Sequence, residues 1–280
     1  EELRRKYQDV GSDATPTVPG DTGDTLLAAL RLGAAVSLMD DSWWHVSVVF
    51  PDGSRTVLMW ERTFPGSIIV DPAGHRFANE AAPYNDLGRV MMERLRQFDT
   101  KHCWLIMDAR HRRNYVFTNI LGGVNPRELI EKSFFIKAGT LDDLAAKCSL
   151  PPHDLKATID RFNRFARAGK DEDFGRGESL FDTIYGDEKV SPNSTLGPIE
   201  NAPFWAVKVY ASDLGTKGGL LTDADGRVLH ESGQPIEGLY ASGNTTASLM
   251  GRGYPGPGAT LGPAGVFAYR AARHAAMRAG

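Results

Sequence analysis

Residues 251–263 constrain the fold of this chain more than any other stretch. They hold five glycines and three prolines, and they lead directly into a helical run. Proline fixes φ and glycine permits positive φ, so such a loop can be rigid and still bring bare backbone close to a ligand. A helix that begins near Thr260 would direct its free N–H groups and the positive end of its dipole toward that ligand. Tyr254 adds a hydroxyl group beside these donors.

This combination suits a carbonyl oxygen that gains negative charge during a reaction. The alternative is structural, because a Gly/Pro connector that leads into a surface helix has the same composition. Loop composition alone leaves both interpretations open.

Composition and charge exclude several classes of function. With 32 basic and 35 acidic residues the formal net charge is −3, which gives no electrostatic case for nucleic acid or an anionic membrane. No apolar run is long enough to cross a membrane, and no signal peptide is recognisable. Cys103 and Cys148 lack zinc-site spacing, and the seven histidines include no HExxH pair. We therefore predict a cytoplasmic protein with no transmembrane segment, no metal and no nucleic-acid partner.

The middle of the chain is typical of a mixed α+β domain. Two β-rich runs on either side of residues 51–53 predict a hairpin, and a second hairpin is expected around residues 71–74. A helix is predicted over residues 153–168, because its apolar residues lie on one face and Gly169 follows it.

The two ends of the chain differ from this middle. They consist of loops, glycine-rich turns and isolated helices, with Asp24 as the expected cap of an early helix. This pattern predicts an α+β domain over residues 36–212, inserted into another domain whose remains are residues 1–35 and 213–280. The chain also opens without Met on residues that read like the middle of a helix, which predicts a fragment or a processed chain.

Two glycine-rich segments resemble nucleotide-binding loops only superficially. Residues 251–256 match G-x-G-x-x-G, but Pro255 lies inside the match and no acidic residue follows at the required distance. Residues 212–219 have the wrong order for a phosphate-binding loop, and a structural turn with a partly buried Thr is the favoured interpretation. No segment supplies a complete dinucleotide fingerprint.

Two further positions can serve either structure or function. Residues 238–244 read as a buried strand that ends in a Gly-Asn turn, where Asn244 would bind a polyol or cap the turn. Tyr84 follows Pro83 in a loop, and it is either an amphipathic cover for a hairpin edge or a functional phenol. A functional phenol needs a neighbour that shifts its pKa from the reference value of about 10.

Taken together, these stretches closely resemble the flavin-dependent 3-ketosteroid Δ1-dehydrogenases, which belong to a wider group of flavoproteins related to fumarate reductase. The matching segments are collinear and span nearly the whole chain; they are residues 39–44 (MDDSWW), 79–84 (NEAAPY), 173–177 (DFGRG), 213–219 (DLGTKGG), 238–244 (GLYASGN) and 254–260 (YPGPGAT). Each segment is weak evidence, but the ordered set is strong, and it favours the functional interpretation of the glycine loop.

The resemblance implies FAD-dependent 1,2-desaturation of 3-ketosteroids in steroid degradation. It implies that Tyr254 and the backbone N–H of Gly258 polarise the C3 carbonyl, and that Tyr84 takes the C2 proton. The C1 hydrogen would leave as a hydride to flavin N5, and an external electron acceptor would then reoxidise the flavin. The family also uses a second Tyr from its N-terminal half to bias the base, and this sequence offers no identifiable counterpart.

The resemblance also implies the residues that bind the flavin. Gly243 and Asn244 match the family's contacts with the ribityl or phosphate region. Ala259, Thr260 and Leu261 match the helix start that faces the pyrimidine edge of the flavin, where the helix dipole would stabilise the anionic reduced form.

One departure from the family is large. Its members have an N-terminal FAD-binding half with G-x-G-x-x-G, and this chain has no such segment. We therefore expect residues 36–212 to be the substrate-covering catalytic domain and the flanks to be the C-terminal share of an α/β FAD-binding domain. The missing half, or a separate chain that supplies it, becomes an expected partner, and the chain alone is expected to be inactive.

The competing hypotheses are a Δ4-ketosteroid dehydrogenase, a fumarate-reductase-like ene-reductase, and a non-catalytic fragment. The YPGPGAT loop favours the Δ1 enzyme over the first two, while the absent fingerprint supports the third.

Overall fold

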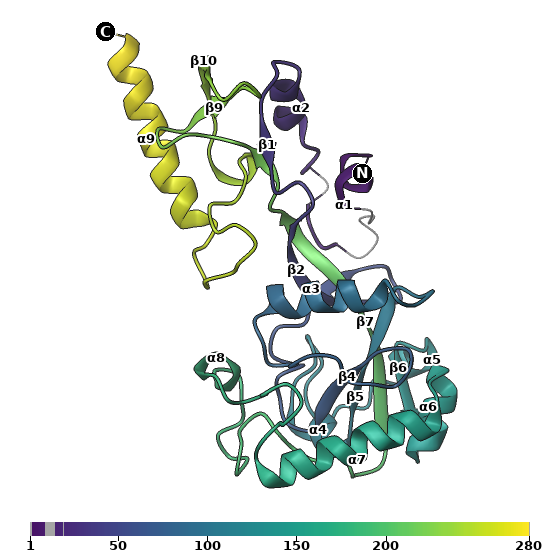
Figure 1. Ribbon diagram of the computed structural model, residues 1–280. Helices are drawn as coiled ribbons and strands as arrows, with labels where there is room; N and C mark the ends of the chain where they lie inside the picture. The colour runs from purple at the N-terminus through teal and green to yellow at the C-terminus, as the bar shows by residue number, and fades with distance from the viewer. Residues whose placement is uncertain (1, 9–14, 19, 280) are drawn as a thin grey trace. The chain divides into compact units, whose positions relative to one another are not determined.

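The computed structural model describes residues 2–8, 15–18 and 20–279, and it divides the chain into two compact units. The central unit comprises Trp44–Ser212, and the flanking unit comprises Glu1–Trp43 together with Asp213–Gly280. The chain passes between them in two strands, β2 (Ser42–Val49) and β7 (Phe204–Thr216), so both ends of the sequence belong to one unit (Figure 1).

The central unit is built on an antiparallel sheet. Its strand order is β3-β2-β7-β5-β4, and β6 also pairs with β7. The additional strands are β3 (Arg55–Val57), β4 (Ser67–Val70), β5 (His102–Met107) and β6 (Phe135–Ala138).

Helices cover both faces of this sheet (Figure 1). Because strand side chains alternate, Ile68 and Ile106 lie in a core with α7, whereas Ile69 and Leu105 lie in a separate core with α3. These helices are α3 (Tyr84–Leu95) and α7 (Pro152–Ala168), and the remaining ones are α4 (Ala109–Asn114), α5 (Arg127–Glu131), α6 (Leu141–Cys148) and α8 (Leu180–Thr183).

The flanking unit has little sheet and a small core. Strand β1 (Val36–Ser37) pairs with β8 (Gly219–Leu220), and β9 (Arg227–Leu229) pairs with β10 (Pro235–Tyr240). The fully buried apolar residues of its core are Ala29, Ala34, Leu220 and Val228. Its helices are α1 (Glu2–Gln8), α2 (Asp24–Leu30), the 3₁₀ turn η1 (Gly243–Thr245) and the long α9 (Leu261–Ala279).

Most of the predicted local structure is confirmed. Strands β2 and β3 form the first hairpin, with Val48 opposite Thr56. Helix α7 ends at Gly169, whose φ of 75° is the left-handed conformation expected there. The second hairpin is reduced to a single bridge between Val70 and Arg76, and the Asp71 side chain accepts hydrogen bonds from the turn backbone.

The expected cap of the early helix is wrong. Asp24 does not cap α2, because Gly23 takes the cap position in a left-handed conformation and Asp24 is the first helical residue. In the structure, the central unit begins at Trp44, and Val36 and Ser37 pair with β8 of the flanking unit. The mixed α+β character is confirmed, while the assignment of catalytic and FAD-binding domains stays a prediction.

Candidate functional site

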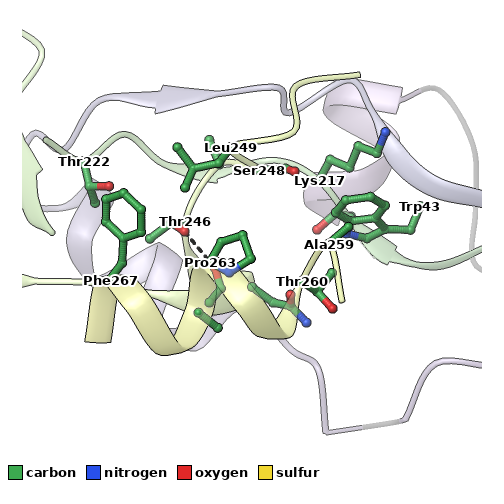
Figure 2. Close-up of a pocket in the computed structure, with 15 residues that line it drawn as sticks. Trp43, Lys217, Thr222, Thr246, Ser248, Leu249, Ala259, Thr260, Pro263 and Phe267 are labelled. Carbon is green, nitrogen blue, oxygen red and sulfur yellow. Dashed lines mark hydrogen bonds between the residues drawn. The ribbon is translucent and has the colours of Figure 1, made fainter. Parts of the chain in front are cut away.

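A pocket in the flanking unit brings together four of the residues predicted to bind the cofactor. Gly243, Asn244, Ala259 and Thr260 all line it. Figure 2 shows Trp43 and Lys217 at one end of this pocket and Thr222 and Phe267 at the other. The other lining residues are Thr216, Thr246, Ala247, Ser248, Leu249, Pro263 and Ala264.

Leu261, the fifth predicted residue, is not part of this lining. It is the first residue of α9 and its side chain is 81% exposed. Tyr254 and Gly258 also lie outside the lining, in the loop that leads to Ala259.

The wall at Gly243 is made by a tight turn at the end of β10. Gly243 has a φ of 69°, which favours glycine, and it opens the 3₁₀ turn. The Thr246 hydroxyl donates to the Gly243 carbonyl at 2.7 Å, and this bond closes the turn (Figure 2). Asn244 is exposed at the tip of the turn, so its side chain is available to a ligand.

Backbone segments approach closely next to this turn. An added Cβ at Gly219 would lie 2.5 Å from the Thr245 carbonyl oxygen, and one at Gly218 would lie 2.6 Å from Met39 Cα. Only glycine fits at either position without movement of the neighbouring backbone. The segment that sequence analysis interpreted as a structural turn therefore packs directly beneath the Gly243–Thr245 turn.

Lys217, and not Thr216, is the buried residue of that segment. Thr216 is exposed, which corrects the expectation of a partly buried Thr, whereas Lys217 is 1% exposed. The Lys217 ammonium donates to the carbonyl oxygens of Arg252 and Gly253 at 2.8 and 3.1 Å. It lies 4.6 Å from the centroid of the Trp43 ring and 3.6 Å from an Asp41 carboxylate oxygen.

Tyr254 is held beside the same cluster. Its ring meets Trp43 edge-on, with the centroids 6.2 Å apart and the planes at 77°. This is a favourable geometry for two aromatic rings. The Tyr254 side chain is half-buried, so its phenol combines a packed ring with access from outside.

The start of α9 completes the pocket. The first bonds of the helix run from Gly262 N–H to the Gly258 carbonyl at 2.9 Å and from Ala264 N–H to the Thr260 carbonyl at 3.1 Å. Pro263 stands in the first turn, where its missing N–H is not needed. Gly258 has a φ of 92°, and a Cβ there would meet nothing within 4 Å. Glycine is therefore required at Gly258 by backbone conformation and not by crowding within the chain.

Tyr84 belongs to the central unit, whereas Tyr254 belongs to the flanking unit. Tyr84 is half-buried and begins α3, directly after Pro83.

The segment before Tyr84 is fixed by buried arginines. Arg62 donates to the carbonyl of Ala82 at 3.0 Å and to that of Glu80. The Glu80 carboxylate pairs with Arg76 at 2.8 Å and with Arg176 at 3.1 Å. Burial opposes ionisation of Glu80, but these two guanidinium groups hold its pKa below the ordinary value. Three arginines thus hold the segment that precedes Tyr84 through its backbone carbonyls and the Glu80 carboxylate.

The donor groups of the pocket fit an anionic or polyol-bearing cofactor. They comprise the N-terminal end of a long helix, a Gly-Asn turn, hydroxyl groups and a buried ammonium. The enclosed space is only about 40 Å³, so it suits the edge or one group of a dinucleotide. A neighbouring cavity of about 410 Å³ shares Thr216 and Asn244 and extends along residues 20–26.

Sequence analysis missed the residues that organise this site. Lys217, Trp43 and Asp41 were not candidates, because a buried ion pair requires neighbours that sequence spacing does not reveal. Their only signal was membership of matching segments. Within residues 2–8, 15–18 and 20–279, no group of three or more His, Cys, Asp or Glu side chains is placed to hold a metal. No described helix has the length and apolar character needed to cross a membrane.

Comparisons with known proteins identify the family of this chain. Residues 1–261 match the family model described as FAD binding domain. The chain is 43% identical to a 3-oxosteroid 1-dehydrogenase of Mycobacterium tuberculosis over 100% of its own length and 51% of the relative's. It is 40% identical to a 4-oxocyclohexanecarboxylate 2-dehydrogenase of Sinomonas cyclohexanicum, over 93% of this chain and 46% of the other.

A solved structure extends the comparison to the fold. The 3-ketosteroid Δ1-dehydrogenase of Sterolibacterium denitrificans, in complex with 1,4-androstadiene-3,17-dione, superposes with a TM-score of 0.93 and 42% identity. The match covers 98% of this chain and 50% of that one, so the chain spans about half the length of the relatives it matches. The chain belongs to the FAD binding domain family and is a homologue of the 3-oxosteroid 1-dehydrogenases.

Proposed function

We propose that this chain forms the carbonyl-binding and flavin-facing part of an FAD-dependent 3-oxosteroid 1-dehydrogenase. The observation that carries the proposal is the convergence of Gly243, Asn244, Ala259 and Thr260 on one pocket at the start of α9, with Tyr254 on the adjoining loop. The similarity to relatives with this activity over the whole chain supports it.

In the proposed reaction, the Tyr254 hydroxyl and the Gly258 N–H donate hydrogen bonds to the C3 carbonyl oxygen of the steroid. These bonds strengthen as the oxygen gains negative charge, so they acidify the hydrogens on C2. Tyr84 takes the C2 proton as general base. FAD, when bound, would supply the two-electron oxidant that loss of the C1 hydrogen as a hydride requires. The steroid product would carry a C1–C2 double bond, and the two electrons would leave to an external acceptor.

The chain's own residues also place the cofactor in this proposal. Gly243 and Asn244 would bind its polyol or phosphate part, and Ala259, Thr260 and Leu261 would face the ring edge. The N-terminal end of α9 favours negative charge there. We further propose that the flanking unit is a share of an FAD-binding domain, that the central unit covers the substrate, and that the remaining share comes from residues or a chain beyond these 280.

A chimera tests the proposal. Residues 1–280 would replace the matched half of the M. tuberculosis relative, and a redox dye would serve as acceptor. The expected product from androstenedione is a dienone that is lighter by two hydrogen atoms. A chimera that folds and contains FAD but forms no such product would contradict the proposal. The 280-residue chain alone, in the same assay, tests whether it is a non-catalytic fragment.

One observation favours a second candidate substrate. A relative with nearly the same identity is named for 4-oxocyclohexanecarboxylate, a single ring with the ketone of a steroid A ring. The proposed chemistry needs only that ketone and its two adjacent carbons. The same assay should therefore include this monocyclic acid, together with 5α-reduced androstenedione for a Δ4 enzyme and fumarate for an ene-reductase. The substrate with the highest kcat/KM identifies the activity.

A further inference from the structure

The loop that carries Tyr254 has little structure of its own. Between residues 251 and 258, three glycines have positive φ, and the bonds within its first part run from Gly251 N–H to Ser248 O and from Gly253 N–H to Met250 O. Arg252 and Gly253 are exposed. Such a segment needs an external anchor to hold one conformation, because glycine has more backbone freedom than any other residue.

A buried ammonium group provides this anchor. Lys217 reaches two consecutive carbonyl groups, those of Arg252 and Gly253, immediately before Tyr254. The same ammonium lies over the ring of Trp43, and Trp43 makes the edge contact with Tyr254. Lys217 therefore fixes Tyr254 along two routes, through the backbone that precedes it and through the ring beside it.

Burial makes the Lys217–Asp41 ion pair stronger than the exposed Arg252–Asp40 ion pair nearby. The side chains of Lys217 and Asp41 are 0% and 2% exposed, so their ion pair is little screened. Arg252 and Asp40 also pair at 2.6 Å, but their side chains are 51% and 57% exposed. Exposed pairs contribute little, so the surface pair does not replace Lys217.

We propose that Lys217 is a positioning residue that holds the Tyr254 hydroxyl in the orientation that carbonyl binding requires. This inference rests on the proposed function for its catalytic consequence, although the contact that it describes can be tested without any activity. Lys217 acts through the loop and Trp43 and transfers no proton.

The first test observes Tyr254 directly in the 280-residue chain. With ring-labelled ¹³C-tyrosine, NMR gives one set of signals for each of the eight tyrosines, and Tyr254→Phe identifies the set of Tyr254. The Trp43 ring current should displace these signals from the positions of a mobile tyrosine. In Lys217→Met we expect the displacement to be lost for Tyr254 alone. The control is Lys208→Met, the same change at an exposed lysine of β7, which should move no Tyr254 signal.

A folded Lys217→Met variant with an unmoved Tyr254 signal would overturn the proposal. If this variant does not fold, Lys217→Arg serves instead. A planar guanidinium is bulkier than an ammonium, so it cannot occupy the same buried position without displacing the loop, and the Tyr254 signal should still move, by a smaller amount. An unmoved signal in folded Lys217→Arg would equally overturn the proposal.

The second test separates positioning from general damage in the chimera described above. We expect Lys217→Met to lower kcat by about 10²-fold, as expected for a small misplacement of a reacting group, with FAD content retained. Lys208→Met should leave kcat unchanged. Equal losses of kcat in both variants would contradict a specific role for Lys217. An inactive wild-type chimera would count against the proposed function alone, because the NMR result stands without turnover.

Discussion

At the residue scale, glycine is required at Gly219 and Gly258 for different physical reasons. Gly219 lacks space, because an added Cβ would lie 2.5 Å from the Thr245 carbonyl oxygen and 2.6 Å from the Thr246 carbonyl carbon. Gly258 has open space but a φ of 92°. A side chain at Gly219 must push the Gly243–Thr245 turn away, whereas one at Gly258 strains only its own backbone.

This distinction predicts two different effects of alanine. Gly219→Ala should lower the free energy of unfolding of the flanking unit by about 1–3 kcal/mol, because it forces backbone apart. Gly258→Ala should cost about 1–2 kcal/mol, the strain of a left-handed residue. Gly265→Ala is the matched control, since Gly265 lies in α9 with open space and alanine favours helix by up to about 1 kcal/mol. Urea unfolding measures all three, and a Gly219→Ala variant as stable as Gly265→Ala would refute the packing argument.

Removal of the hydroxyl group is expected to lower kcat at Tyr254 and Tyr84 but not at an exposed tyrosine. In the chimera, Tyr254→Phe should lower kcat by about 10²–10³-fold through loss of a donor to the developing oxyanion. Tyr84→Phe should lower it by about 10²–10⁴-fold through loss of the base. The control is Tyr269→Phe, a tyrosine of α9 that is 67% exposed, which should keep normal turnover. Near-normal kcat in Tyr254→Phe and Tyr84→Phe would contradict the roles of Tyr254 as carbonyl donor and of Tyr84 as base.

At the scale of elements, sequence patterns predicted what is local and missed what is brought together by folding. The helix over residues 153–168 and the β2–β3 hairpin follow from periodicity and turn residues, so both were predicted. The four pocket residues came from the resemblance to a family. Lys217 was not predicted, because its partners Asp41 and Arg252 come from distant segments and a lone Lys is usually a surface residue.

Helix α4 contains a group that makes the central unit sensitive to acid. His111 is fully buried, and its Nε2 lies 3.2 Å from the Glu61 carbonyl oxygen, while its Nδ1 has no partner among the described residues. Protonation would place an unpaired N–H in the interior. Burial therefore lowers the pKa of His111 to about 3, from an ordinary 6.5.

The sign of the resulting pH dependence follows from this lowered pKa. Between pH 6.5 and about 3 the unfolded chain binds a proton at His111 that the folded chain does not, so stability falls as the pH falls through this window. His111 contributes a slope of about 1.4 kcal/mol per pH unit to the free energy of unfolding, and this contribution vanishes above pH 6.5. His111→Gln keeps a donor for the Glu61 carbonyl but cannot titrate. As the pH falls, the unfolding free energy of this variant should therefore fall by about 1.4 kcal/mol per pH unit less than that of the wild type. Identical slopes for wild type and His111→Gln would contradict the assignment.

At the scale of the whole molecule, the two units differ in how much core they contain. The central unit buries large clusters on both faces of its sheet. Among the described residues, the core cluster of the flanking unit has four buried apolar residues, and its sheets are two short strand pairs, although this unit carries the candidate site. We infer that the site is built in the less stable unit, where bound cofactor adds much of the missing stability.

Hydrogen exchange measured by mass spectrometry tests this difference. In the 280-residue chain, amides of β5 and of β7 up to residue 212 should exchange far more slowly than those of β1, β8, β9 and β10. In the FAD-loaded chimera, protection of β8 and η1 should rise, while that of β5 stays unchanged. Uniform protection of both units without FAD would contradict this account.

The most direct test of the central claim is the absorbance spectrum of the FAD-loaded chimera, mixed anaerobically with androstenedione. If the chain supplies the carbonyl-binding and flavin-facing residues, the oxidised flavin band at about 450 nm should bleach, and one equivalent of dienone should form per flavin. In Tyr254→Phe the bleaching should slow by about 10²–10³-fold, with the same final product. A spectrum that retains its full oxidised band with bound FAD and excess steroid would contradict the claim.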